Sequence, residues 1–279
     1  MQWEGQEESS NVEDRRGEHV GFAVAGGGSI LLAILAFIFG GNFGGFNQNQ
    51  DRPAQQRSFN PEEEKLAKFT SVILRDTEVV WEDLFRRMGK EYRKPHLVLF
   101  SGAVDSACGR AAASVGPFYC PEDSKVYIDL SFYRDMQRKL NAPGEFARAY
   151  VIAHEVGHHV QKLLGYSQRV DEARRYRNKG ESNRMSVRLE LQADYFAGVW
   201  AHHAQEKFHF LDPGDVESAL NAAFQIGDDR LQKQAQGHVV PDSFTHGTSR
   251  QRMRWFREGF KTGDVNRARL LFDLPYNEL

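Results

Sequence analysis

Two histidines four residues apart, with a glutamate directly after the first, form the clearest chemical pattern in this chain: His154-Glu155-Val156-Gly157-His158. Residues four apart on a helix share a face, so both imidazoles can bind one metal ion. Glu155 is one step round the helix and can reach a water molecule beside that ion. The pattern therefore indicates hydrolysis supported by zinc, with His154 and His158 as ligands and Glu155 as general base.

The alternative for these two histidines is a structural pair whose ring nitrogens are satisfied by hydrogen bonds. Apolar residues recur along one side of the same segment and would bury it: Ala149, Ala153, Val156, Val160 and Leu163. Imidazoles beside such a stripe need polar partners. We favour a metal ion as that partner, because all fixed positions of the five-residue pattern are filled.

A catalytic zinc ion needs three protein ligands and one open position. Downstream, Glu190 and Asp194 stand four residues apart in a segment predicted to be helical, again on one face. We predict Glu190 as the third ligand and Asp194 as the acceptor of a ring N–H from a zinc-bound histidine, which would fix its tautomer. Acid pairs at this spacing are usually solvated, but apolar neighbours predict a buried helix here, where unpaired carboxylates are costly.

The elements that must position these residues are mostly helical. Asn60 and Pro61, followed by acidic residues, form a helix start, and the helix is predicted to run from 61 to 89. Two short segments rich in branched and aromatic residues predict strands, and four more segments predict helices: 96–100 and 125–130, then 145–164, 182–203, 212–226 and 249–260. A small sheet beside a helical body gives an α+β fold.

Composition limits the function classes. The chain has 279 residues, 41% of them hydrophobic and 27% charged, and a formal net charge of −2, so no overall field favours nucleic acid, and none is expected as a partner. Its two cysteines are too few for a zinc finger with four cysteine ligands, and we expect histidine and carboxylate to hold any metal. Cys108 and Cys120 form either one disulfide or two small buried thiols.

The chain before the predicted domain divides into three parts. Residues 1–20 are polar and acidic and predict a disordered tail. Residues 21–41 carry no charge and predict a single transmembrane helix, with a cleaved signal peptide or a buried soluble helix as alternatives. Residues 42–60 are rich in Gly, Asn and Gln and predict a flexible linker, so the folded domain is expected at 61–279.

Longer stretches of the sequence are similar to a known family. The His-Glu-x-x-His helix and the later Glu-Leu-Gln-Ala-Asp resemble the gluzincin peptidases. Four segments look like the bacterial putative neutral zinc metallopeptidase family: CGRAAASVGPFYCPEDSKVYIDL, AHEVGHHVQ, ELQADYFAGVWAHH and SFTHGTSRQR. The likeness extends from about Phe59 to Phe272 and also covers the apolar segment. It implies a zincin-like metallopeptidase domain behind a single membrane helix.

The resemblance also implies roles for further residues. Gluzincins often place a histidine after the third ligand to stabilise the oxyanion, which makes His246 the candidate donor and an ordinary loop histidine the alternative. Tyr119 and Tyr127 are weaker candidates. By fold analogy, the strand 125–130 is the edge along which an extended peptide would pair.

His202 and His203 are not expected to be ligands, and the basic residues near the C-terminus, among them Arg252, are expected to face water.

These inferences combine into one expectation: a zinc metalloendopeptidase in the cell membrane, whose domain lies outside the cytoplasm and cleaves peptide or protein substrates. The alternative is a catalytically silent zinc-binding scaffold. A zinc-dependent hydrolase of other amides is a third interpretation. The sequence identifies no particular substrate and no oligomeric state.

Overall fold

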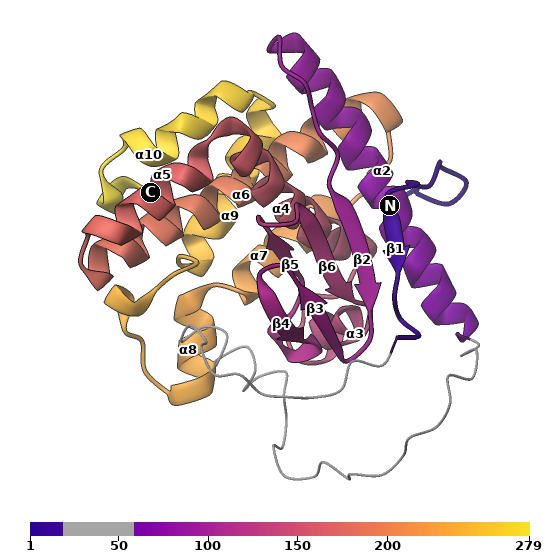
Figure 1. The fold of residues 1–279 in the computed structure, drawn as a ribbon, viewed down its shortest axis with the longest axis horizontal. Coiled ribbons are helices and arrows are strands. Elements are labelled where there is room, and N and C mark those ends of the chain that lie inside the picture. The colour runs from indigo at the N-terminus through magenta and orange to yellow at the C-terminus, as the bar shows by residue number, and fades with distance from the viewer. Residues whose placement is uncertain (19–58) are drawn as a thin grey trace.

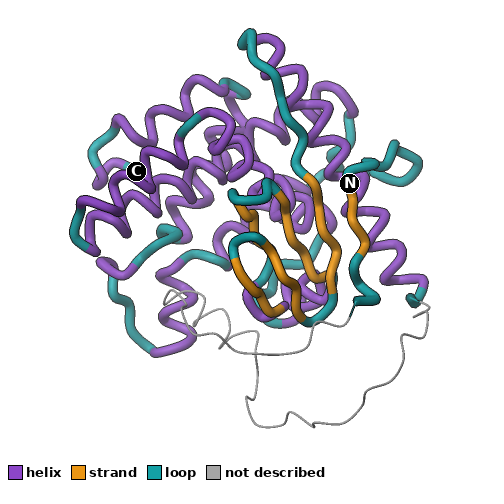
Figure 2. The backbone as a smooth tube through the Cα atoms, viewed as in Figure 1, coloured by secondary structure: helices purple, strands orange, loops and turns teal. Residues whose placement is uncertain are grey.

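A small sheet lies against a larger body of helices in this α+β fold (Figure 1). The computed structural model describes residues 1–18 and 59–279. In Figure 2 the strands gather on one side of the molecule and the helices form the rest. The predicted fold class, mostly helical with a small sheet, is confirmed for the described part of the chain.

The strands are β1 (Val12–Asp14), β2 (His96–Phe100), β3 (Ala103–Ser106), β4 (Gly109–Ala112), β5 (Phe118–Cys120) and β6 (Lys125–Asp129). The helices are α2 (Pro61–Arg87), α3 (Ser131–Arg138), α4 (Glu145–Leu164), α5 (Tyr166–Tyr176), α6 (Lys179–Phe208), α7 (Asp215–Gln225), α8 (Asp228–Gln236), α9 (Ser249–Thr262) and α10 (Leu270–Asp273).

The main sheet has the strand order β1-β2-β6-β5, and β3 and β4 form a separate hairpin. β1, β2 and β6 run parallel, whereas β5 pairs antiparallel with β6. β6, predicted as the edge for an extended substrate, is therefore an inner strand, and that prediction is wrong. Among the described strands, β5 is the edge on this side.

Helix α2 begins where the sequence predicts. The Asn60 side chain accepts a hydrogen bond from the Glu63 backbone N–H at 2.8 Å, and Pro61 fills the first helical position. One face of the helix is buried along most of its length, with Val72, Ile73 and Trp81 inaccessible to solvent. α2 thus covers the helical body and lies beside the N-terminal segment (Figure 1).

Helix α4 carries the His-Glu-x-x-His sequence and ends at Gly165, whose φ of +83° is a left-handed value that favours glycine. Gly157 lies directly against α6: a Cβ there would be 3.0 Å from the carbonyl oxygen of Ala193. This close approach of two backbones brings the histidines of α4 beside the carboxylates of α6.

Helices α6 and α9 touch even more closely. A Cβ on Gly198 would lie 2.1 Å from the Phe256 carbonyl oxygen, and one on Gly259 would lie 2.0 Å from the Tyr195 carbonyl oxygen. Real side chains never come so near, so the crossing requires glycine on both helices.

Residues 1–18 belong to the folded domain, so the prediction of a disordered tail is wrong for them. Trp3 is only 3% exposed and packs edge-to-face on Phe69, with ring centres 5.3 Å apart. Ser9 and Asn11 each donate a 2.7 Å hydrogen bond to the buried carboxylate of Glu78. The segment is polar because it supplies strand pairing and hydrogen bonds rather than a broad apolar face.

The N-terminal segment is also held by charge. Arg16 is 2% exposed and pairs with Asp14 at 2.6 Å and with Glu64 at 3.1 Å. The amino group of Met1 lies 3.0 Å from Asp212 and 3.1 Å from Asp215. These contacts join residues 1–18 to α2 and to the start of α7.

The prediction of a single transmembrane helix must also be corrected. Within residues 1–18 and 59–279, every helix is too short or too polar to cross a bilayer. The flanks of the apolar segment pack in one domain, because β1 pairs with β2 and α2 begins at Pro61. Segment 21–41 itself, and the predicted linker up to residue 58, lie outside the described residues.

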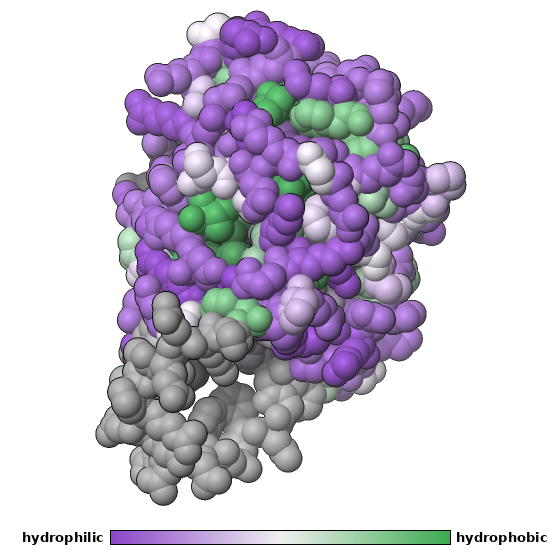
Figure 3. All heavy atoms as spheres, turned by 90° about the vertical axis from the view of Figure 1, so that its right-hand side faces the viewer, coloured by the Kyte–Doolittle hydropathy of each residue, from purple (hydrophilic) through white to green (hydrophobic). Residues whose placement is uncertain are grey.

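The face formed by α2 and the N-terminal segment is mostly hydrophilic, with hydrophobic side chains visible as small patches (Figure 3). A hollow of about 690 Å³ lies between the two, lined by residues such as Trp3, Glu8 and Lys68. Its described lining contains no histidine, so the chemistry suggested by the sequence lies elsewhere.

Candidate metal centre and cleft

The structure brings His154 and His158 of α4 together with Glu190 of α6. One potential ligand atom from each residue lies within 4.8 Å of the others. His154 Nε2 is 3.3 Å from Glu190 Oε2, and His158 Nε2 is 3.6 Å from Glu190 Oε1. Two nitrogen atoms and a carboxylate therefore surround one point, as the sequence pattern predicts for three ligands of one ion.

The hydrogen bonds behind these rings fix the tautomers. His154 Nδ1 is 2.8 Å from Asp194 Oδ1, a carboxylate oxygen that only accepts. His158 Nδ1 is 2.9 Å from Gln161 Oε1, and the amide of Gln161 is oriented because its Nε2 donates to the Leu189 carbonyl oxygen at 2.5 Å. Both rings therefore carry their N–H at Nδ1.

A neutral imidazole with its proton on Nδ1 presents a lone pair at Nε2. When both rings are neutral, that lone pair faces an oxygen of Glu190 on each histidine, so acceptor meets acceptor unless a cation or a second ring proton lies between them. A cation removes this repulsion. Imidazole nitrogen and carboxylate oxygen are ligands that zinc accepts, and a site of three such ligands leaves one position open. The residues present thus fit a catalytic zinc ion.

The pKa values of the candidate ligands also favour a cation at this point. Burial alone would lower the pKa of His154, but the Asp194 carboxylate and the hydrogen bonds to Asp194 and Glu190 raise it to about 9. Burial raises the pKa of Glu190, yet the neighbouring His246, His158 and His154 outweigh it and hold this pKa well below its usual value. The group therefore favours positive charge between the rings and the carboxylate.

Asp194 is completely buried, and its charge is balanced by neighbours from two other helices. Arg252 of α9 binds it through Nε at 2.8 Å and Nη2 at 3.0 Å, and the Tyr150 hydroxyl donates to it at 2.5 Å. Burial raises the pKa of Asp194, but the charges of Arg252 and His154 lower it overall. Asp194 therefore remains an anion that accepts the ring N–H of His154.

Sequence reasoning missed Arg252 as part of this site. It was grouped with the basic residues expected to face water, but its side chain is only 3% exposed. Its position offered one signal, since Trp255 and Phe256 on the same helix are buried and Arg252 lies one turn before them. Arg250, two residues earlier on the same helix, is exposed.

Glu155 lies on α4 beside the two histidines and lines the same cavity. Its side chain is nearly inaccessible, and this burial raises the pKa of its carboxyl above the usual value, an effect that His158 and His154 partly offset. A carboxylate with a raised pKa accepts a proton more readily than an exposed one.

His246 lines this cavity from the loop between α8 and α9. The loop is organised by Asp228, whose Oδ2 accepts backbone N–H groups of Thr245, His246 and Gly247 at 2.8, 2.6 and 3.0 Å. Asp228 itself is inaccessible to solvent. Sequence reasoning did not find it, because its partners lie 17 to 19 residues away and share no local pattern.

The two tyrosines considered as weaker oxyanion donors are engaged elsewhere. The Tyr119 hydroxyl lies 3.0 Å from His159 Nδ1, and the Tyr127 hydroxyl donates to Asp123 at 2.7 Å. His159 Nε2 donates to the Arg93 carbonyl oxygen at 2.5 Å, and burial lowers the pKa of His159 to about 4. His159 is therefore neutral, with both ring nitrogens used in the protein interior.

A cavity of about 460 Å³ opens over the metal-binding group. Beside its polar residues, much of its lining is apolar: Val115, Phe118, Phe132, Val151, Ile226 and Leu231. β5 forms part of one wall, since Phe118 and Tyr119 belong to it. The cavity thus combines a polar centre with an apolar wall and a free strand edge.

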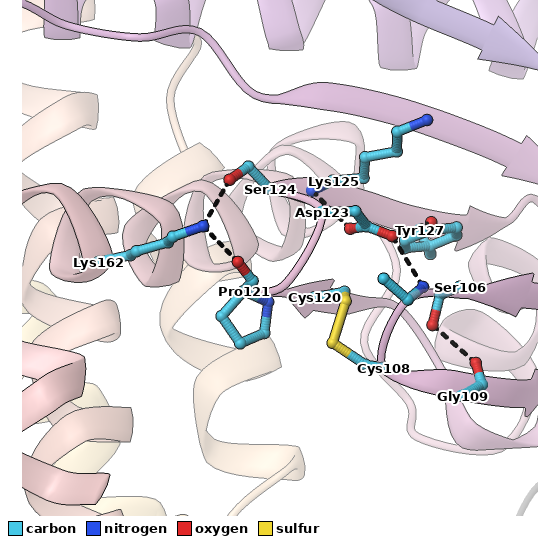
Figure 4. The surroundings of a disulfide bond; sticks show 11 residues. Ser106, Cys108, Gly109, Cys120, Pro121, Asp123, Ser124, Lys125, Tyr127 and Lys162 are labelled. Atoms are coloured by element: carbon cyan, nitrogen blue, oxygen red, sulfur yellow. Dashed lines mark hydrogen bonds between the residues drawn. A yellow bond between two sulfur atoms is a disulfide. The ribbon is translucent and has the colours of Figure 1, made fainter.

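A disulfide braces that edge strand. Cys108, in the turn between β3 and β4, is bonded to Cys120 of β5, which settles the open choice between a disulfide and two thiols (Figure 4). Lys162 of α4 reaches the turn between β5 and β6, where it binds the Pro121 carbonyl oxygen and, at 2.7 Å, the Ser124 hydroxyl. The edge of the cleft is therefore tied both to the hairpin and to the helix that carries the histidines.

Comparisons with known proteins agree on one family. Its profile, described as putative neutral zinc metallopeptidase, matches residues 1–270. The uncharacterized protein YpfJ of Escherichia coli (strain K12) is 53% identical over 277 residues, which cover 95% of this chain and 96% of that protein. An uncharacterized protein of Mycobacterium tuberculosis (strain ATCC 25618 / H37Rv) is 43% identical over 199 residues, covering 68% of this chain and 65% of that protein. No solved structure matches.

Proposed function

The chain belongs to the putative neutral zinc metallopeptidase family, and from this premise we propose that it is a zinc-dependent endopeptidase acting on extended peptide segments. The observation that carries the proposal is the convergence of His154 Nε2, His158 Nε2 and the Glu190 carboxylate around one point, with cavity space beside them. When bound there, zinc would lower the pKa of water and polarise the carbonyl of the peptide bond.

The chain's own residues then have distinct tasks. Glu155 takes a proton from the water that adds to the peptide carbonyl carbon, and it gives a proton to the nitrogen as the carbon–nitrogen bond breaks. The products are one carboxylate and one amine, so a single water molecule is consumed. His246 lines the same cavity from the loop before α9 and donates a hydrogen bond to the carbonyl oxygen as negative charge develops on it.

Asp194 and Arg252 act through His154 rather than on the substrate. Asp194 holds the His154 ring with Nε2 toward the metal position, and Arg252 keeps Asp194 ionised in the protein interior. Such outer contacts typically change metal affinity by about 10–100-fold when they are lost.

The cleft favours an extended peptide with apolar side chains. β5 is an edge strand at the cavity, so its free backbone groups can pair with a substrate strand regardless of most side chains. The apolar wall that includes Phe132, Ile226 and Leu231 would accept a hydrophobic substrate residue. Unfolded proteins offer both features.

The disulfide supports a location outside the reducing cytoplasm. Bonds such as Cys108–Cys120 form and persist in oxidising compartments. We therefore propose that the domain works in an extracytoplasmic compartment.

The experiment that tests the activity is the substitution Glu155→Gln in the full chain. It removes the proton acceptor but none of the three ligands, so zinc content should stay at the wild-type level while cleavage of unfolded casein falls about 10²–10⁴-fold. Glu217→Gln, on the exposed surface of α7, is the matched control and should cleave normally. If zinc-loaded wild-type protein cleaves none of a panel of unfolded proteins and apolar peptides, the chain is a zinc-binding scaffold and the proposal is wrong.

A further inference from the structure

A second group of potential metal ligands lies near the C-terminal end of α6. His202, His203 and Glu206 each offer one ligand atom, and these atoms lie within 4.8 Å of one another. Along α6, His202 is twelve residues beyond Glu190, or about 18 Å at 1.5 Å per helical residue. The group is therefore separate from the candidate catalytic centre.

Backbone carbonyls fix the tautomers of both histidines here. His202 Nδ1 is 2.8 Å from the Phe260 carbonyl oxygen, and His203 Nε2 is 2.8 Å from the Gly263 carbonyl oxygen. A carbonyl oxygen only accepts, so these ring nitrogens carry the N–H. Both carbonyls lie at the C-terminal end of α9, where helix carbonyls have no partner further along the helix.

The remaining nitrogen of each ring faces the same carboxylate. His202 Nε2 lies 3.4 Å from Glu206 Oε1, and His203 Nδ1 lies 3.1 Å from Glu206 Oε2. With neutral rings, lone pairs of nitrogen and oxygen oppose each other, and a cation between them removes the repulsion. His154, His158 and Glu190 show the same arrangement at the candidate catalytic centre.

The packing around the rings is specific. A Cβ on Gly263, which has a φ of +59°, would come within 2.4 Å of the His202 ring, so the His202 position depends on a glycine at the end of α9. Metal-binding histidines commonly donate their second ring N–H to a backbone carbonyl, as both rings do here.

We propose that His202, His203 and Glu206 form a second site for a divalent transition-metal ion such as zinc, for which imidazole and carboxylate are suitable ligands. The Glu206 side chain is 63% exposed, so solvent completes the coordination and the ion exchanges more readily than at the candidate catalytic centre. A bound ion would connect the C-terminal ends of α6 and α9, because each histidine joins a ligand atom on α6 to a carbonyl of α9.

The alternative for this group is a pair of protonated imidazoles that bind Glu206 and cap α9 without metal. Glu206→Gln distinguishes the two, because it removes the anionic ligand and leaves both contacts to the α9 carbonyls. The variant is also expected to fold, since Glu206 is exposed.

The test is zinc titration of untagged, metal-free full-length protein, with bound zinc measured after equilibrium dialysis and the affinity by calorimetry. Wild type should bind two equivalents of zinc. Glu206→Gln and His203→Ala should each bind one equivalent tightly, and their affinity for the second equivalent should be at least tenfold lower than that of wild type. His158→Ala should keep the weaker equivalent, which isolates the second site from the candidate catalytic one.

Two results would overturn the proposal. One is a single equivalent in wild type that Glu206→Gln leaves unchanged. The other is a second equivalent that survives in Glu206→Gln and His203→Ala with unaltered affinity. Casein cleavage by zinc-loaded Glu206→Gln should match wild type, so failure of the second site and failure of the peptidase proposal give different results.

Discussion

Arg252 of α9 binds both carboxylate oxygens of Asp194 of α6, with Nε 2.8 Å from Oδ2 and Nη2 3.0 Å from Oδ1. The pair is buried, and the same Asp194 accepts the His154 ring N–H. A cation on one helix therefore determines, through an anion on a second helix, how a histidine on a third helix presents its lone pair.

Replacing Arg252 with Met should leave Asp194 as an uncompensated buried charge. We expect a loss of about 3–5 kcal/mol in the free energy of unfolding, the usual effect of removing one partner of a buried ion pair. Zinc affinity, measured by competition with a chelating dye, should fall by about 10–100-fold. The exposed Arg250→Met on the same helix is the control, and equal denaturation midpoints for the two variants would contradict the assignment.

Removing the Asp228 carboxylate should disorganise the loop that presents His246. In Asp228→Ala, three backbone N–H groups lose their acceptor, and we expect kcat/KM for a peptide substrate to fall about 10–100-fold with zinc content unchanged. His246→Ala should cause a similar loss. If Asp228 acts through His246, the double variant should be little worse than either single one, whereas fully additive losses would refute that link.

Asp76 of α2 should make stability depend on pH. It is 3% exposed, and burial raises the pKa of its carboxyl from 3.8 to about 7. The folded state therefore holds a proton that the unfolded state has already released, so this contribution to stability is present below pH 4 and is lost as pH rises to about 7. Asp76→Asn should gain about 3 kcal/mol over wild type between pH 5 and pH 8 in urea denaturation. A constant difference between the two proteins at both pH values would rule this out.

Trp3 should contribute to global stability, because its ring is buried against Phe69 and its Nε1 donates to Glu145 at 3.0 Å. Truncating a buried Trp typically costs about 3–5 kcal/mol, and Trp3→Ala should show a loss of this order in thermal or chemical unfolding. Glu4→Ala, one residue further and exposed, should change stability by less than about 0.5 kcal/mol. Identical unfolding of Trp3→Ala and wild type would mean that residues 1–18 do not fold with the domain.

Local patterns in the sequence predict α2, α4, α6, α7 and α9 but not the shorter α3, α5, α8 and α10, and they predict long-range partners poorly. The bounds of α4, Glu145–Leu164, match the predicted 145–164, because an apolar stripe and the terminal Gly165 define them. The convergence of His154, His158 and Glu190 could also be anticipated, since His154 and His158 stand four residues apart on one helix and Glu190 stands four residues before Asp194 on another. What those residues do in turnover stays a prediction.

Other features depend on contacts that no window of sequence contains. Arg252 binds Asp194, from which it is separated by 58 positions in the sequence, and β1 pairs with β2 across more than eighty residues. The composition of the polar N-terminal segment, taken alone, suggests disorder. The burial of Trp3 and the hydrogen bonds to Glu78 become favourable only when α2 is present, and the segment itself does not show this. The inner position of β6 likewise follows from the sheet order rather than from the strand itself.

The crossing of α6 and α9 at Gly198 and Gly259 has a mechanical consequence. At these two glycines main chain rests on main chain, so no side chain lies at the point of crossing that could change rotamer to let one helix slide or roll on the other. The spacing between α6 and α9 is fixed at this crossing. Arg252 lies on α9, close to the crossing. Any change in the shape of the cavity is therefore expected to come from its walls, while α6 and α9 keep their spacing at this crossing.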